Sequence, residues 1–196
     1  IDMKAEGVST APIKLISGKS AFCETFFDYV KVPKENLVGG LNAGWTIAKY
    51  LLTHERSSIG TLPQLPKSLL EVALDEVGLE NGELDDMVLR NGIAQFLIDA
   101  TAFNMPLERG ADEAKAGSPP GAKSSFYKYY GSELNKRRFE LLLSAQGFDG
   151  LSWGDEYKEG KLARDMCRTK ANSIEGGTSE VQLNIISKRI IGLPSK

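Results

Sequence analysis

The sequence of 196 residues is 41% hydrophobic and 26% charged, a composition that can bury one substantial core and that argues against disordered and fibrous proteins. Its 26 acidic and 24 basic residues nearly cancel, so no summed field favours nucleic acid or a membrane surface as a partner. No apolar run approaches the roughly 20 residues that cross a bilayer, and no charged-then-apolar leader is seen, so we expect a cytoplasmic protein.

The first part of the chain, to about Leu37, predicts β-structure. Glycine and proline residues punctuate it at short intervals, as expected of strands and turns. The β-prone runs are residues 11–16, 21–29 and 30–32. These runs are typical of the final strands of a sheet domain.

After Asn42 the hydrophobic spacing changes from two to about 3.6 residues, which predicts helices. The expected helices cover approximately residues 45–59, 67–77, 85–109, 126–147, 155–170 and 179–191. Asp85 is the expected cap of the third helix, and Pro106 should kink or shorten it. Asn81 and Gly82 form a turn signal. Long amphipathic helices joined by short breaks predict a helical bundle that packs beside the sheet remnant.

The few cysteine and histidine residues limit the possible chemistry. Cys23 and Cys167 lie far apart and outside any Cys-x-x-Cys or Cys/His cluster, so we expect neither a disulfide nor a metal site. Both are expected to be buried apolar fillers. His54 is the only histidine, so a hydrolase triad would depend on this single residue.

Three segments resemble a known family. Residues 26–39 read FFDYVKVPKENLVG and are followed by Gly44-Trp45. Residues 174–182 read IEGGTSEVQ, and residues 144–147, reading SAQG, give a weaker match. In this order the segments resemble the acyl-CoA dehydrogenase family, first where its middle β-domain passes into a helix and then at its carboxy-terminal signature.

The resemblance implies a mainly α fold, in which a carboxy-terminal four-helix-bundle domain of the acyl-CoA dehydrogenase type follows the last strands of the middle β-domain. We assign residues 1–38 to the end of the middle β-barrel domain and residues 39–196 to the bundle, and expect the family's amino-terminal helical domain to be absent from this chain. The resemblance also implies FAD, an acyl-CoA substrate, an electron-transfer flavoprotein as acceptor, and a homo- or heterotetramer. It is strongest toward bacterial pimeloyl-CoA and steroid side-chain dehydrogenases.

The family's reaction, the oxidation of an acyl-CoA to the trans-2-enoyl-CoA, needs a carboxylate that removes the α-proton. Many members place it immediately before the Gly-Thr of the signature, where this sequence has Gly176. A minority, which includes the isovaleryl- and long-chain-type enzymes, place it on the first helix of this domain before an arginine. By resemblance, Glu55 is therefore the base and Arg56 is assigned to substrate binding. Glu175, one residue out of register, is the rival, and a surface ion pair is the ordinary role for Glu55.

The glycine pair of the signature precedes a predicted helix. Ser179 and Gln182 have capping-box spacing, so free N–H groups at the helix start would suit flavin ribose or phosphate oxygens. The resemblance assigns cofactor binding to Gly176, Gly177, Thr178, Glu180 and Gln146. An ordinary capped helix is the alternative for this segment.

The sequence also departs from the family. The arginine motif that typical members carry near residues 78–91 is missing, with Arg90 the nearest cation, and Gln146-Gly147 lacks the full glycine pattern. Two alternatives therefore stay open: a catalytically silent or half-site subunit of a heterotetramer, and an acyl-CoA oxidase-like relative. The isolated fragment is expected to be inactive.

Two clusters on the fourth predicted helix have ordinary interpretations. Tyr127, Tyr129 and Tyr130 are expected to pack in the core or at an interface. The trio of residues 136–138, reading KRR, is expected to form a solvated face, with contact to a CoA phosphate as the alternative.

Overall fold

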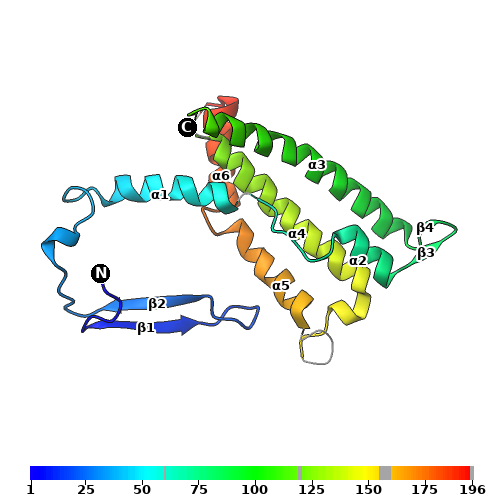
Figure 1. Ribbon diagram of the computed structural model, residues 1–196, viewed down its shortest axis with the longest axis horizontal. Helices are drawn as coiled ribbons and strands as arrows, with labels where there is room; N and C mark the ends of the chain where they lie inside the picture. Colours follow the sequence, from blue (N-terminus) through cyan, green and yellow to red (C-terminus); the bar gives the residue numbers. More distant parts are fainter. Residues whose placement is uncertain (60, 119–120, 155–159, 195–196) are drawn as a thin grey trace. The chain divides into compact units, whose positions relative to one another are not determined.

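The computed structural model describes residues 1–59, 61–118, 121–154 and 160–194, without the side chains of residues 53 and 56–59 (Figure 1). The chain divides into two compact units, Ile1–Leu52 and Thr53–Lys196. The boundary that we placed between residues 38 and 39 stays a prediction. None of the helices in the described part of the chain combines the length and the hydropathy that a membrane span requires.

The first unit contains an antiparallel hairpin of β1 (Val8–Ile13) and β2 (Phe22–Phe27), in which Val8 faces Phe27. The expected strand at residues 11–16 begins and ends too late, because the turn closed by the bond from Gly18 N to Leu15 O already occupies its second half. The expected strand at residues 30–32 is wrong. Tyr29, with φ 50°, breaks the extended backbone just before it.

The 3₁₀ turn η1 (Lys34–Asn36) follows, and α1 (Gly44–Ile59) confirms the first predicted helix. The second, α2 (Leu69–Glu76), begins at a capping box. Ser68 Oγ accepts from Glu71 N at 3.2 Å, and the Glu71 carboxylate accepts from Ser68 N at 2.7 Å.

The turn signal at Asn81 and Gly82 is confirmed by a small hairpin of β3 (Leu79–Glu80) and β4 (Glu83–Leu84). The third helix, α3 (Met87–Lys115), is capped by Asp86 rather than by Asp85. It continues past Pro106, so the expected shortening is wrong. Packing against α4 stabilises the helix through this point, where Tyr127 Oη donates to the Pro106 carbonyl at 2.9 Å.

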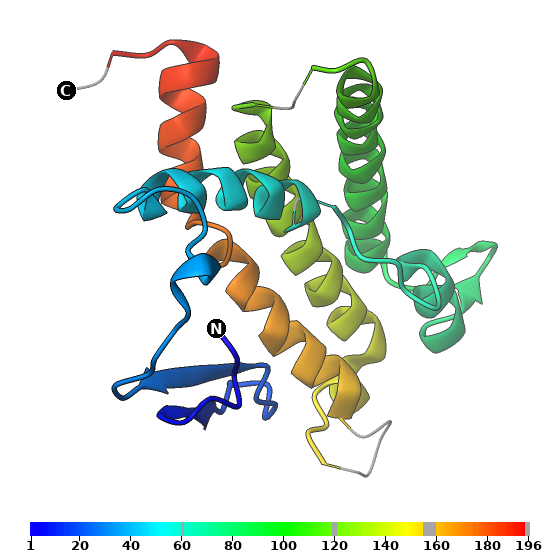
Figure 2. The same cartoon turned by 60° about the vertical axis from the view of Figure 1, so that its left-hand side comes forward.

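The central element of the second unit is α4 (Lys123–Gly150), which contacts α2, α3, α5 (Lys161–Thr169) and α6 (Ser179–Ile186). Figures 1 and 2 both show α3 and α5 on different sides of α4. The predicted stop at Gly147 is confirmed, because its φ of 56° and ψ of −134° interrupt the helix there.

Apolar side chains of α2, α3 and α4 supply most of the core. The buried residues of this cluster are Leu69, Ala73, Leu84, Leu89, Ile93, Phe96, Phe103, Tyr127, Leu134, Phe139, Leu142 and Ala145. Tyr130 packs on Phe103 and Phe126 with ring centroids 5.3 and 5.7 Å apart. The packing role predicted for Tyr127 and Tyr130 is therefore confirmed.

The last part of the chain follows the prediction with one change of boundary. Residues 155–159 of the expected helix lie outside the described residues, and α5 begins at Lys161, after Gly160 in the left-handed conformation. The 3₁₀ turn η3 (Lys170–Ser173), α6 and the π-helical turn η4 (Ser187–Ile191) complete the chain. Cys23 is exposed and Cys167 is half-buried, so the expectation that Cys23 is buried is wrong.

Candidate functional site

The segment of residues 175–178, which we call the signature turn, joins η3 to α6 and needs glycine at its centre. Gly176 has φ +65° and Gly177 has φ +98°, in the region that L side chains rarely adopt. Gln182 Nε2 donates to the Gly176 carbonyl at 3.1 Å, and a Cβ on Gly177 would lie 2.5 Å from the same nitrogen. A buried glutamine thus packs directly against the glycine pair.

The start of α6 is capped differently from the prediction. Thr178 Oγ1 accepts from Val181 N at 3.3 Å, whereas Ser179 is the first helical residue and Gln182 turns back to the signature turn. The predicted capping box of Ser179 and Gln182 is therefore wrong, because the helix begins one residue too early for Ser179 to be its N-cap. Glu180 lies exposed in the first turn, where its own backbone N–H and then the Thr178 hydroxyl lower the pKa of its carboxyl.

Glu175 is held at both carboxylate oxygens. Arg168 Nη2 donates to Oε2 at 2.8 Å, and Asn172 Nδ2 donates to Oε1 at 2.5 Å. The Glu175 side chain is only 22% exposed, so these bonds are shielded from most of the solvent. They fix the carboxylate against α5 and η3.

A chain of hydrogen bonds links this carboxylate to the segment that follows α1. Asn172 Oδ1 accepts from Asn135 Nδ2 at 2.9 Å, and Asn135 Oδ1 accepts from Arg138 Nη2 at 2.9 Å. Arg138 Nη1 then donates to the Pro63 carbonyl at 2.9 Å. We call this hydrogen-bonded chain, from Pro63 through Arg138, Asn135 and Asn172 to Glu175, the relay. It connects the segment after α1 with the centre of α4 and with the signature turn.

Arg138 is 8% exposed, and burial lowers the pKa of its guanidinium. The solvated face expected for residues 136–138 is therefore wrong for Arg138. Neither Arg138 nor Asn135 was assigned to a site from the sequence. One signal could have identified them. The two residues are three positions apart, and so on one face of α4, a long helix that other helices contact.

Pro63, Asn135 and Asn172 of the relay line a pocket of about 460 Å³, which we call the relay pocket. Its lining residues are Thr61, Pro63, Gly131, Ser132, Asn135, Phe139, Asp165, Arg168, Thr169, Asn172 and Glu175. Most of these residues carry a hydroxyl, amide or charged group. The pocket can therefore orient a ligand by hydrogen bonds close to the signature turn.

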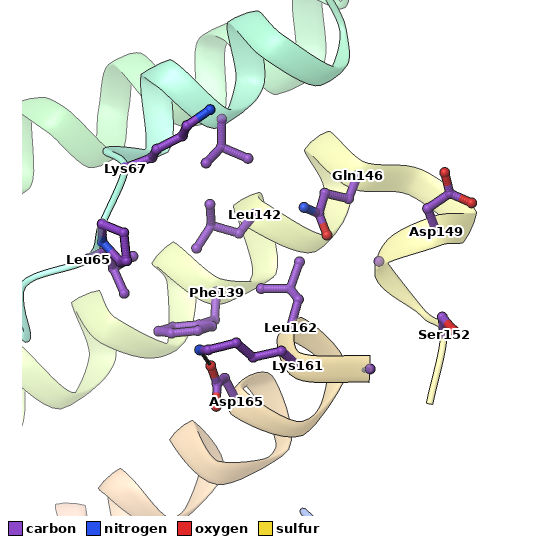
Figure 3. Close-up of a pocket in the computed structure, with 14 residues that line it drawn as sticks. Leu65, Lys67, Phe139, Leu142, Gln146, Asp149, Ser152, Lys161, Leu162 and Asp165 are labelled. Atoms are coloured by element: carbon purple, nitrogen blue, oxygen red, sulfur yellow. Dashed lines mark hydrogen bonds and ion pairs between the residues drawn. The ribbon is translucent and has the colours of Figure 1, made fainter. Parts of the chain in front are cut away.

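A second pocket, of about 320 Å³, lies between α2, α4 and α5 (Figure 3). Figure 3 shows Leu142, Phe139 and Leu162 at its centre, with the Lys161–Asp165 ion pair at one side. Gln146 lines it and donates from Nε2 to Glu76 Oε1 at 3.3 Å. Gln146 therefore lies in a pocket different from that of Glu175, although Phe139 and Asp165 line both.

Glu55 lies on α1 with an exposed side chain. The Arg56 side chain lies outside the described residues. Thr61 and Pro63, which follow α1 in the sequence, line the relay pocket. Among the residues that the structure describes, no group of three or more His, Cys, Asp or Glu side chains is arranged to hold a metal ion.

Comparison with known proteins places this geometry in a family. A match to the family described as acyl-CoA dehydrogenase, C-terminal domain, covers residues 42–191, from just before α1 to the end of η4. The chain belongs to the acyl-CoA dehydrogenase family. The predicted resemblance and fold class, a mainly α carboxy-terminal domain of this type, are thereby confirmed.

Individual acyl-CoA dehydrogenases extend the comparison. Acyl-CoA dehydrogenase FadE34 of Mycobacterium tuberculosis is 30% identical over 99% of this chain, which spans 26% of that relative. The solved steroid ACAD Tcur3481-Tcur3483, as a G363A variant, matches 100% of the chain with TM-score 0.82 at 23% identity. The ChsE4-ChsE5 complex from Mycobacterium tuberculosis matches 100% of it with TM-score 0.76 at 25% identity. The chain spans 52% of each solved chain.

Proposed function

We propose that this chain is the carboxy-terminal part of an FAD-dependent enzyme that oxidises an acyl-CoA thioester to the trans-2-enoyl-CoA. The observation that carries this function is the family match over residues 42–191, which includes the signature turn and the helix that it starts. The family is generally FAD-dependent. Since the chain spans only part of its relatives, the function is proposed for the full-length protein.

The residues of the signature turn fit the polar part of FAD. Two glycines with positive φ expose peptide edges, and the first amides of α6 precede its intrahelical hydrogen bonds. A helix start of this kind favours oxygen-rich and anionic groups. We therefore propose that Gly176, Gly177 and Thr178 contact FAD, with Glu180 beside them and Gln146 from the second pocket.

Two carboxylates compete for the role of base, and their surroundings differ. Both oxygens of Glu175 already accept hydrogen bonds, one of them from a guanidinium, so the carboxylate is held in place and is not free to approach a substrate. Glu175 is better suited to hold the turn against α5. We therefore assign the α-proton abstraction to Glu55, with Arg56 beside the substrate.

Each part then has one task. When bound, FAD would supply the acceptor for the hydride that leaves the β-carbon. Glu55 takes the α-proton, and the bound acyl chain would exclude water from the surroundings of its carboxylate. The relay from Pro63 through Arg138 to Asn172 fixes the position of the segment after α1 relative to the signature turn.

The test uses the full-length protein, purified with its bound flavin. A panel of acyl-CoA thioesters is added without oxygen, and the flavin absorbance and the product are measured. We expect at least one thioester to bleach the flavin and to yield an equimolar trans-2-enoyl-CoA. A protein that binds FAD and thioester but shows neither bleaching nor product would contradict the proposed reaction.

The electron acceptor is tested with the same reduced protein. We propose an electron-transfer flavoprotein, so reoxidation should be fast with that partner and slow with dissolved oxygen. Fast reoxidation by oxygen with release of hydrogen peroxide would instead indicate an acyl-CoA oxidase-like relative.

A second candidate function is that of a silent or half-site subunit in a heterotetramer. Both solved proteins named above are described by two components, and the arginine motif typical of the family is missing from residues 78–91. A homotetramer that contains one FAD per chain and bleaches fully would exclude this candidate. An unlike partner chain together with half-stoichiometric FAD would support it.

A further inference from the structure

Lys128, on α4, is completely buried, with 0% of its surface exposed. Its Nζ has no hydrogen-bond partner among the residues that the structure describes. Lysine is rarely buried in this way, because an ammonium group loses its hydration and needs compensation. Desolvation accordingly lowers the pKa of Lys128.

Lys128 faces the signature turn. α4 contacts both α6 and η3, and the carboxylates of Glu175, in the turn, and Glu180, in the first turn of α6, act electrostatically on Lys128. Glu133 and Lys136 act on it from α4 itself. Of these four charged groups, Glu175 lies in the turn, Glu180 lies in the helix that follows it, and the other two lie on α4.

The surroundings of Lys128 are polar and under-bonded. Ser125 and Ser132 lie on the same face of α4, one helical turn before and after Lys128, and both hydroxyls are buried without a partner among the described residues. Ser179 Oγ and Gln182 Oε1, on α6, are in the same state. Unmatched polar groups concentrated on both facing helices indicate a site shaped for something other than packing.

A residue that weakens the fold and is nevertheless present is expected to serve a function. An apolar side chain of similar length at position 128 would avoid the desolvation of a charge, so the lysine contributes nothing to stability that methionine would not. What the lysine adds is a positive charge on the buried side of the turn that is proposed to hold FAD. Such a charge favours the extra negative charge of a reduced flavin.

We propose that Lys128 is a positioning residue for the cofactor, whose ammonium group holds the signature turn in its flavin-binding form and makes the reduction potential of the bound flavin more positive. This inference rests on the proposed function, since it requires FAD at the signature turn. It concerns the oxidising power of the flavin and is separate from proton abstraction by Glu55.

The experiment compares full-length wild-type protein with Lys128→Met, which keeps the length of the side chain and removes its charge. Lys128→Gln is the second uncharged variant. The matched control is Lys123→Met, which removes an exposed lysine of the same helix that pairs with Glu113. The flavin midpoint potential is measured by dye-coupled reductive titration, the FAD dissociation constant by reconstitution of apoprotein, and Tm on the apoprotein.

For both Lys128 variants we expect a more negative midpoint potential and several-fold weaker FAD binding, with an apoprotein Tm equal to or above that of the wild type. Lys123→Met should change neither the potential nor the affinity. Unchanged potential and affinity in the Lys128 variants would overturn the inference. A fall in Tm with an unchanged potential would overturn it as well, because it would show a purely structural lysine. A wild-type protein without FAD would instead overturn the proposed function.

Discussion

At Gly177 the backbone and a side chain impose the same requirement. The φ of +98° excludes most L residues, and the space where a Cβ would lie is occupied by Gln182 Nε2. The Gln182 side chain is fully buried and bonds to the Gly176 carbonyl, so it has little freedom to move away. The turn is therefore sensitive to the addition of a single methyl group.

Gly177→Ala should lower the free energy of unfolding by about 1 to 3 kcal/mol through backbone strain, and should weaken FAD binding by the full-length protein. Urea unfolding followed by circular dichroism measures the first effect, and FAD titration the second. The control is Gly40→Ala, where φ is not positive and no atom lies within 4 Å of the added Cβ. Equal stability of the two variants would contradict this description of the turn.

At this scale the sequence identified the glycines and the candidate carboxylates but not the partners that fix them. The glycine pair is visible because few residues tolerate positive φ. The bonds from Arg168 and Asn172 to Glu175 depend on how η3 bends back after α5, which no local pattern encodes. For the same reason the burial of Lys128 and Arg138 could not be predicted, since lysine and arginine side chains are ordinarily exposed.

Among the elements, α3 and α4 approach closely at two glycines of α3. A Cβ on Gly92 would lie 2.8 Å from Leu141 Cδ2, and a Cβ on Gly110 would lie 2.6 Å from Tyr127 Oη. The same hydroxyl donates to the Pro106 carbonyl. The two glycines thus let α4 approach α3 closely enough for Tyr127 to form a hydrogen bond with the α3 backbone.

Gly110→Ala should destabilise the protein by about 1 to 3 kcal/mol, because the new methyl group overpacks against Tyr127. Tyr127→Phe alone should cost about 0.5 to 1.5 kcal/mol through the lost hydrogen bond. The double variant should be less destabilised than the sum of the two, since phenylalanine removes the closest atom. Chemical denaturation of the four proteins gives the coupling, and strict additivity would show that the contact is absent.

An ion pair between the same helices makes stability depend on pH. Arg137 Nη2 donates to Asp99 Oδ2 at 2.5 Å, and this hydrogen bond lowers the pKa of the Asp99 carboxyl below its ordinary value of 3.8. A lowered pKa contributes stability that is present above the unfolded-state pKa and is lost as the pH falls through the folded-state pKa.

Asp99→Asn should therefore be less stable than the wild type at neutral pH, and the difference should shrink as the pH falls below about 4. Denaturation midpoints measured from pH 7 to pH 2.5 test this. Glu108→Gln, on the exposed face of α3, is the control and should leave the curve unchanged. A difference that stays constant on acidification would mean that the ion pair does not set this dependence.

The elements were predicted best where a strong pattern coincided with a local stop signal. Hydrophobic spacing located α1, α2 and α4, and as expected α4 is interrupted at Gly147 and ends at Gly150. The errors arose where tertiary contacts override local preference. Helix α3 passes Pro106 because α4 packs along it, and the start of β1 depends on its pairing with β2.

At the scale of the whole molecule, the hairpin of the first unit carries large apolar side chains that stay exposed among the described residues. Phe22, Phe26 and Phe27 of β2 are 49%, 51% and 58% exposed. Phe22 and Phe26 lie on one face of the strand and Phe27 on the other. Exposed aromatic side chains of this kind are typical of a surface that another part of the protein or another subunit covers. The tests of function above therefore use the full-length protein with any partner chain that copurifies.

The assignment of the base is the central claim, and it separates two carboxylates in different surroundings. Glu55→Gln and Glu175→Gln both remove a charge and keep the size of the side chain. Glu175→Gln should lower stability, because the guanidinium of Arg168 loses a charged partner, but it leaves the proposed base in place.

The most direct measurement is anaerobic flavin bleaching by an acyl-CoA that reduces the full-length wild-type protein, compared with both variants after FAD and ligand binding have been verified. We predict that Glu55→Gln binds both but bleaches at least about 100-fold more slowly, as expected for the loss of a general base, whereas Glu175→Gln still bleaches. Loss of bleaching in Glu175→Gln together with normal bleaching in Glu55→Gln would contradict the account and make Glu175 the base.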